Sequence, residues 1–449
     1  MNNIKEKEKE RGVLLLLFKD SLLKNSIFLM AASFVQSIIG FIFWIIAARY
    51  YSPNDVGITS AIFSSISLIS MVGSLGLSRA LIYYLPREGK TDKILNSCLT
   101  INVVSSIIFS FIFISGLKIW SPDLLSVLNN LKDVLIFLII TIAISISALL
   151  SAAFTAGRRS SFCMIKDSAF NIVKIFPLFF LIQFGAMGIL TSLSFGLFLS
   201  LIIGFYLLFK VWKYRPNIKL DPIIKNMAIF SAGNYVTDIF YNLPRLILPI
   251  MILNMISAKS AGYFYIAIMM SCLLYGISQS ISSSFLVESS DKDKFWNNVN
   301  KSIKFNMIIL IPGIILFMIF GKFILNLFNP SYADNATSTM LILTIVSIPL
   351  SLIAIFNTIM NAQNRVMNMI KMNIMVAGVT LLLSTISIVF IKMNIEGIAI
   401  SYLIANTIGA IIVINRIKNP KEFTLRLLND VKNDVRLFIN RKDIKYENG

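Results

Sequence analysis

NMAIFSAGNYVTDIFYNLPRLILPIMILN, residues 226–254, is the stretch that decides the fold class of this protein. It is apolar and long enough to cross a bilayer, because about 20 helical residues span the hydrocarbon core. Polar side chains nevertheless recur along it at helical spacing, which places them on one face. The polar residues of this face are Asn234, Asp238, Tyr241, Asn242 and Arg245. Pro244 and Pro249 each remove a backbone donor and so predict a bend or break beside Arg245.

Arg245 is the strongest candidate for a binding residue. A guanidinium near the middle of a membrane helix costs roughly 3 kcal/mol or more, so it should face protein or water rather than lipid. We therefore expect Arg245 to face an anionic substrate. The alternative is a buried ion pair with Asp238, but two helical turns separate the two residues by roughly 10 Å in a straight helix. Asp238 is then a candidate for coupling transport to Na⁺ or H⁺.

Composition places the whole chain in a membrane. Of 449 residues, 56% are hydrophobic and only 14% are charged, whereas soluble proteins carry about a quarter charged residues. The mean hydropathy is +0.78. The net charge of +19 is spread over short loops, which argues against a nucleic-acid partner. The chain has no histidine, and its three cysteines lack metal-binding spacing, so we expect no metal site, cofactor or catalytic centre.

Hydropathy predicts an all-α fold of twelve transmembrane helices. The predicted spans are 26–48, 57–78, 95–116, 133–156, 166–184, 187–209, 226–254, 261–286, 304–325, 337–362, 369–390 and 395–414. The predicted domains are a cytoplasmic and amphipathic N-terminus (1–25), a six-helix bundle (26–209), a basic linker (210–225), a second six-helix bundle (226–414) and a basic tail (415–449). Lys and Arg concentrate in the loops on the side of the termini, so both termini should be cytoplasmic, in a multi-pass cell-membrane protein.

The two predicted bundles repeat each other. Gly57 and Gly262 both stand at the start of a predicted span, 205 residues apart. Met164-Ile165-Lys166 recurs as Met369-Ile370-Lys371 at the same offset. Because each half has six spans, both halves have the same orientation, as expected for a parallel repeat about an axis along the membrane normal. Such a repeat predicts a substrate cavity between the halves.

Other polar side chains inside predicted spans are further candidates. Ser67 and Ser74 lie on one face of the second span, and Ser278 has the equivalent place in the eighth. They either line a water-filled cavity or allow close helix packing. Lys174 is either a second cavity cation or extends to the inner interface. Arg79 is interpreted as an interfacial anchor.

Four segments resemble the Wzx-type polysaccharide flippases, in the polysaccharide-transporter branch of the multidrug/oligosaccharidyl-lipid/polysaccharide (MOP) superfamily. They are AARYYSPNDVG (47–57), GLSRALIYYLP (76–86), NLPRLILPIMI (242–252) and AGYFYIA (261–267). The resemblance implies a MATE-like fold of two six-helix bundles, related by a pseudo-two-fold axis along the membrane normal. It also implies a central cationic cavity between the bundles and alternating access. Members often carry an acidic residue just before the arginine of the seventh span. This chain has Pro244 there, which shifts an acidic role to Asp238.

The resemblance implies a flippase rather than an enzyme. Its substrate would be an oligosaccharide on a polyprenyl phosphate or pyrophosphate, moved from the inner to the outer leaflet for surface polysaccharide assembly. Its partners would be membrane lipids, a polysaccharide polymerase and glycosyltransferases. Three alternatives remain open: a cation-coupled multidrug exporter of the same fold, a lipid II flippase and a membrane glycosyltransferase. An exporter of cations should carry intramembrane carboxylates without a central arginine.

Overall fold

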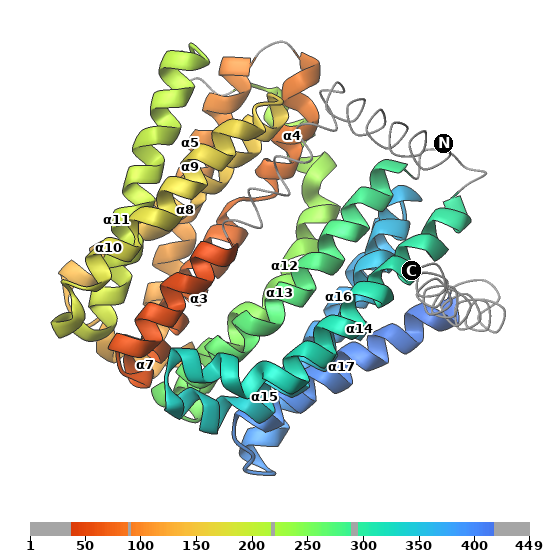
Figure 1. The fold of residues 1–449 in the computed structure, drawn as a ribbon. Coiled ribbons are helices and arrows are strands. Elements are labelled where there is room, and N and C mark those ends of the chain that lie inside the picture. The colour runs from red at the N-terminus through yellow and green to blue at the C-terminus, as the bar shows by residue number, and fades with distance from the viewer. Residues whose placement is uncertain (1–36, 89–90, 217–220, 289–294, 417–449) are drawn as a thin grey trace, which may run out of the picture. The chain divides into compact units, whose positions relative to one another are not determined.

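The computed structural model describes residues 37–88, 91–216, 221–288 and 295–416, and within these ranges the chain is helical and has no strand (Figure 1). The predicted all-α fold is confirmed. The chain forms two compact units, Met1–Gly262 and Tyr263–Gly449. The predicted N-terminal segment 1–25 and the greater part of the tail 415–449 lie outside the described residues.

Nine helices in the described ranges are long and apolar enough to cross a membrane. They are Pro53–Gly73, Asp92–Ser115, Leu131–Ala156, Ile182–Val211, Ile223–Met255, Ser302–Phe328, Pro330–Ala362, Val366–Val389 and Ile395–Asn415. The predicted spans 26–48, 166–184 and 261–286 are outside this set, so the count of twelve stays a prediction. The chain is a multi-pass membrane protein.

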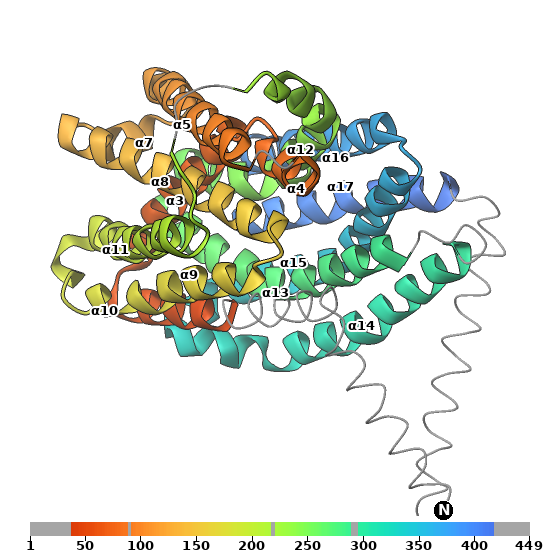
Figure 2. The same cartoon turned by 90° about the horizontal axis from the view of Figure 1, so that it is seen from above.

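The first unit is built around α3 (Pro53–Gly73), which packs against α5, α8, α11 and α12. The helices of this unit after α3 are α4 (Leu77–Glu88), α5 (Thr91–Ser115), α6 (Leu117–Trp120), α7 (Pro122–Val127), α8 (Leu131–Ala156), α9 (Ser160–Val173), α10 (Ile175–Leu178), α11 (Gly185–Tyr206) and α12 (Ile223–Met255). Both α9 and α10 lie along α11 (Figure 2). Helix α12, placed by the sequence in the second bundle, packs here on α3 and α4. The division into six and six helices stays a prediction.

A capping box starts α3 and also anchors α11. The Ser52 hydroxyl accepts from the backbone N–H of Asp55 at 3.1 Å, and the Ser52 N–H donates to Asp55 Oδ2 at 3.3 Å. These bonds satisfy donors that a helix start leaves unpaired. The other oxygen, Asp55 Oδ1, accepts from the N–H of Ala186 at the start of α11. One carboxylate thus fixes the ends of two membrane helices.

Helix α12 runs unbroken from Ile223 to Met255 with Pro244 and Pro249 inside it. The break predicted beside Arg245 is therefore wrong. A proline removes one helical hydrogen bond, but helices packed in a membrane protein tolerate this loss because neighbours support them. Arg245 consequently lies on a continuous helix.

The second unit contains most of α13 (Ala258–Glu288), followed by α14 (Phe295–Phe328), α15 (Pro330–Ala362), α16 (Val366–Val389) and α17 (Ile395–Arg416). Helix α15 packs against α14, α16 and α17. It is therefore the central helix of the second unit.

Candidate functional site

An ion pair joins α4 to α12 within the first unit. Arg79 Nε lies 2.6 Å from Asp238 Oδ2, and Arg79 Nη2 donates to Asp238 Oδ1, also at 2.6 Å. Two parallel contacts between a guanidinium and a carboxylate form the strongest kind of ion pair, because charge and geometry both match. The Arg79 side chain is 46% exposed and the Asp238 side chain 34%. The pair is therefore accessible from outside the first unit.

A break in the second predicted span presents Arg79 to Asp238. Helix α3 ends at Gly73, and α4 starts at Leu77 after Leu75 and Gly76, whose φ angles are 48° and 73°. Left-handed backbone of this kind ends a helix and redirects the chain. A Cβ on Gly76 would lie 2.9 Å from Ser231 Oγ and 2.9 Å from Tyr235 Cβ, so the turn is pressed against α12.

Tyr235 of α12 fixes the same break through its hydroxyl, which donates to the carbonyl oxygen of Val72. This carbonyl lies in the last turn of α3, where it also accepts from the N–H of Leu75 at 3.3 Å. The hydroxyl therefore stabilises the end of α3 and binds it to α12. The start of α4, and with it Arg79, is held at a defined place beside Asp238.

Asn242 connects Asp238 to Arg245 along α12. Its Nδ2 donates to the backbone carbonyl of Asp238 at 2.9 Å, and its Oδ1 accepts from Arg245 Nη2 at 3.2 Å. The order along the helix is Arg79–Asp238, then Asn242, then the exposed Arg245. We call these four residues the arginine row. It carries two guanidinium groups against one carboxylate, a net charge of +1.

The carboxylate of Asp238 pairs with Arg79, so the alternative pairing with Arg245 is wrong. Sequence reasoning missed Arg79 because an arginine at a predicted span end usually marks an interface. One signal was present in the sequence: Gly76 stands three residues before Arg79, and glycine readily adopts the positive φ that ends a helix. Arg79 pairs with α12, and its interpretation as an interfacial anchor stays a prediction.

The remaining predicted residues of the first unit lie at several places. Tyr241 and Asn234 are half-buried on α12, and the Asn234 Oδ1 is buried without a hydrogen-bond partner among the described residues. Ser74 donates to the carbonyl of Met71 at 2.8 Å beside the α3–α4 break, and Ser67 is half-buried on α3. Ser278 is buried on α13, in the second unit.

Lys174 is enclosed within the first unit, where its side chain is 5% exposed. Its Nζ donates to Asn171 Oδ1 at 2.7 Å and lies 4.9 Å and 4.5 Å from the ring centres of Phe43 and Phe170. Aromatic faces stabilise an ammonium group in this way. The ammonium group is therefore enclosed by protein, and among the described residues no contact joins it to the arginine row.

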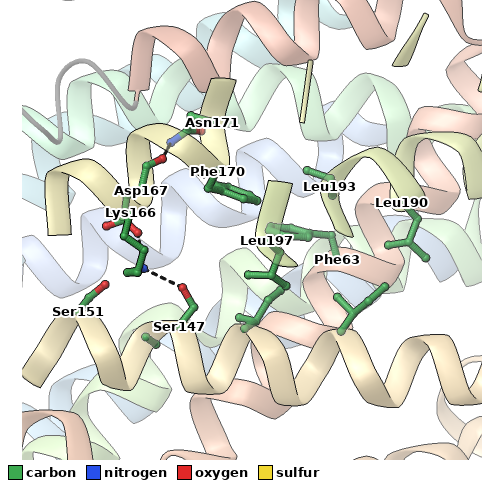
Figure 3. Close-up of a pocket in the computed structure, with 13 residues that line it drawn as sticks. Phe63, Ser147, Ser151, Lys166, Asp167, Phe170, Asn171, Leu190, Leu193 and Leu197 are labelled. Carbon is green, nitrogen blue, oxygen red and sulfur yellow. Dashed lines mark hydrogen bonds and ion pairs between the residues drawn. The ribbon is translucent and has the colours of Figure 1, made fainter. Parts of the chain in front are cut away.

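A cavity of about 340 Å³ lies near Lys174, between α3, α8, α9 and α11 (Figure 3). At its polar end Lys166, 1% exposed, donates to Ser147 Oγ at 2.8 Å and pairs with Asp167. Figure 3 shows leucine and phenylalanine side chains around the rest of it. This cavity includes none of the residues predicted from the sequence as site residues.

Comparison with known families decides the class. The sequence matches the family described as "Polysaccharide biosynthesis protein" over residues 22–274, more than half of the chain. The chain belongs to the polysaccharide biosynthesis protein family. The resemblance to Wzx-type flippases is thereby confirmed at the level of the family. No curated protein is a significant match to the sequence.

Solved structures show that members of the MOP superfamily share the fold of this family member. The lipid II flippase MurJ, in an inward closed conformation, aligns with a TM-score of 0.70 and 16% identity over 90% of this chain and 91% of that chain. An inward-facing multidrug resistance MATE family transporter of the MOP superfamily aligns with a TM-score of 0.67 and 12% identity over 91% of this chain and 99% of that chain. A MOP superfamily transporter from Pyrococcus furiosus aligns with a TM-score of 0.62 and 12% identity over 92% of this chain and 96% of that chain. The predicted MATE- and MOP-like fold class is confirmed.

The described residues contain no group of three or more His, Cys, Asp or Glu side chains placed to hold a metal ion. The chemistry at the arginine row is instead that of two guanidinium groups, which donate hydrogen bonds to oxygen anions. Such groups can bind an oxygen anion.

Proposed function

We propose that this protein is a flippase for lipid-linked oligosaccharides, which binds the phosphate or pyrophosphate group of a polyprenyl carrier at the arginine row. The observation that carries the proposal is the row itself, with Arg79 and Arg245 on adjoining helices and one carboxylate between them. Moving a phosphate through hydrocarbon without compensation is prohibitive. Charge-assisted hydrogen bonds from guanidinium groups replace the lost hydration.

The family membership supports a role in polysaccharide assembly, and the fold is one that MurJ, a lipid II flippase, also uses. In the proposed cycle the oligosaccharide carrier enters from the inner leaflet of the cell membrane and leaves to the outer leaflet by alternating access. Both termini would be cytoplasmic. Glycosyltransferases would supply the substrate, and a polysaccharide polymerase would consume it.

Charge argues against the multidrug exporter as the alternative. A cationic drug requires carboxylates in the binding site, whereas the arginine row carries one carboxylate, already paired with Arg79. A coupling cation, Na⁺ or H⁺, at Asp238 would have to displace the Arg79 guanidinium. Coupling through Asp238 stays a prediction, with this competition as its physical condition.

The test is transport by purified protein in vesicles that contain a lipid-linked oligosaccharide with a fluorescent glycan. Externally added quencher reports how much of the glycan has crossed. We expect Arg245→Ala to abolish crossing and Arg245→Lys to keep part of it, because lysine retains the charge but not the planar donor pair. Lys322→Ala, which removes a cation that is 70% exposed in the second unit, is the matched control and should transport normally. Normal transport by Arg245→Ala would refute the proposal.

A further inference from the structure

Asp238 binds the guanidinium of Arg79, which the proposed function assigns to the substrate. Its two oxygens bind Nε and Nη2 of Arg79, which leaves the Nη1 group of Arg79 without a recorded partner among the described residues. An anion approaching Arg79 therefore meets one open nitrogen and two nitrogens already bound. To engage the whole guanidinium it has to displace Asp238.

The exposure of the pair indicates that displacement is feasible. With 46% of Arg79 and 34% of Asp238 exposed, neither group is enclosed by the protein. Exposed ion pairs typically contribute up to about 1 kcal/mol, and paired contacts such as these place Arg79–Asp238 at the upper end of that range. A fully buried pair would instead be a permanent cross-link, because separation would leave an uncompensated charge.

The backbone holds the pair in place while it opens. The Gly76 turn and the Tyr235 bond fix the start of α4 against α12 independently of the ion pair. Asn242 likewise keeps contact with Arg245 and with the carbonyl of Asp238, not with its carboxylate. Releasing the carboxylate from Arg79 therefore needs only side-chain rotation.

Charge determines which anions can displace Asp238. The Asp238 carboxylate carries a single negative charge and is held beside Arg79 by the fold. Its effective concentration at Arg79 is therefore higher than that of a free anion in solution. A singly charged anion in solution offers no stronger interaction than the carboxylate it replaces. A phosphate or pyrophosphate group carries more charge and several oxygens, so it competes with the carboxylate for the Arg79 guanidinium more strongly.

We propose that Asp238 is a specificity-determining residue, which holds Arg79 until a multiply charged phosphate group displaces it and thereby excludes singly charged anions. This inference rests on the proposed function and concerns the selectivity of the same site. It assigns Asp238 a role as the competing counter-ion of Arg79. It also explains why a site built to release its substrate carries a carboxylate: Asp238 rebinds Arg79 as the phosphate leaves.

The experiment measures binding of two probes, inorganic pyrophosphate and acetate, to purified full-length protein in a neutral detergent by calorimetry at fixed ionic strength. Wild type should bind pyrophosphate and show much weaker binding of acetate. Asp238→Asn keeps the shape of the side chain but loses its charge. We expect acetate affinity to rise about fivefold in Asp238→Asn, the factor that corresponds to the loss of a competing ion pair of about 1 kcal/mol.

Two further variants separate displacement from a general change in local charge. In the background Arg79→Ala, adding Asp238→Asn should leave the ratio of acetate to pyrophosphate affinity unchanged, because the guanidinium that Asp238 holds is already absent. Arg79→Lys, which cannot make the paired contact, should show a ratio between wild type and Asp238→Asn. Asp334→Asn, which removes the partner of Lys322 in the second unit, is the control and should bind both probes as wild type does.

The inference is overturned if Asp238→Asn leaves the affinity ratio unchanged, or if its effect persists without Arg79. Transport by wild type that depends on Arg245 would in either case leave the proposed function standing. Failure of wild type to bind pyrophosphate would overturn the selectivity inference. Failure of wild type to move the lipid-linked oligosaccharide would overturn the function itself.

Discussion

Gly57 of α3 lies directly against Gly262 at the start of α13. A Cβ on Gly57 would come within 1.7 Å of the Ala258 carbonyl oxygen, and a Cβ on Gly262 within 2.2 Å of the Pro53 carbonyl oxygen. Two helices approach this closely only where neither carries a side chain. These two glycines are also the pair that the internal repeat aligns, 205 residues apart. The repeat thus places small residues at both sides of one contact.

We predict that Gly57→Ala disrupts this crossing. The added methyl group meets backbone, which cannot move aside as a side chain does, so the helices must separate at a cost of about 1–3 kcal/mol or more. Thermal unfolding of the purified protein measures the loss. Gly378→Ala is the matched control, because a Cβ there meets nothing within 4 Å. Equal melting temperatures for the two variants would contradict the predicted contact.

Gly76→Ala should impair transport through the position of Arg79. Its φ of 73° costs an alanine about 1 kcal/mol or more, and the methyl group would also press on Ser231 and Tyr235. The start of α4 then shifts relative to α12. We expect a lower transport rate for protein that still inserts in the membrane, and weaker pyrophosphate binding. Wild-type binding and transport by this variant would show that the turn does not set the arginine row.

Lys174→Ala and Arg245→Ala should differ in their effect on the free energy of unfolding. Removing the buried Lys174 leaves the Asn171 oxygen without its donor and opens a void beside two aromatic rings, a loss of about 2–3 kcal/mol. Arg245 is exposed, so its removal should change the free energy of unfolding by no more than about 0.5 kcal/mol. Denaturant unfolding and transport are measured on both. A destabilised Arg245→Ala beside an unaffected Lys174→Ala would reverse these assignments.

The class of the protein and the polar face of α12 could be predicted because both are local. Hydropathy over some 20 residues marks a membrane helix, and a helical period places Asp238, Asn242 and Arg245 on one side. The contact of Asp238 with Arg79 spans 159 residues and depends on how α4 packs against α12. No periodicity within either helix contains that information. The same holds for Lys174, whose burial depends on Phe43 from another helix.

Proline shows how a local rule can be applied too strongly. Pro244 and Pro249 predict a bent or broken helix when α12 is considered alone, and only the break is excluded by the structure. In the structure α12 continues through both of them. Tertiary packing determined the outcome, and single-sequence reasoning has no access to packing between helices.

Tyr51 offers a prediction about pH. Its side chain is buried in the link between the helix at 37–50 and α3, and its hydroxyl donates to the Leu178 carbonyl at 2.8 Å. Burial, followed by the negative charge of Asp55, raises the pKa of Tyr51 to about 12. An unfolded tyrosine has a pKa of about 10, so the folded state favours the neutral phenol. This contribution to stability is complete below about pH 10 and is lost as the pH rises through about 12.

Tyr51→Phe lacks the hydrogen bond to the Leu178 carbonyl and should therefore be less stable than wild type by about 1 kcal/mol at pH 8. The difference should shrink as the pH approaches 12. Melting temperatures of both proteins between pH 8 and pH 12 measure it, and a difference that stays constant over that range would contradict the role assigned to the Tyr51 hydroxyl.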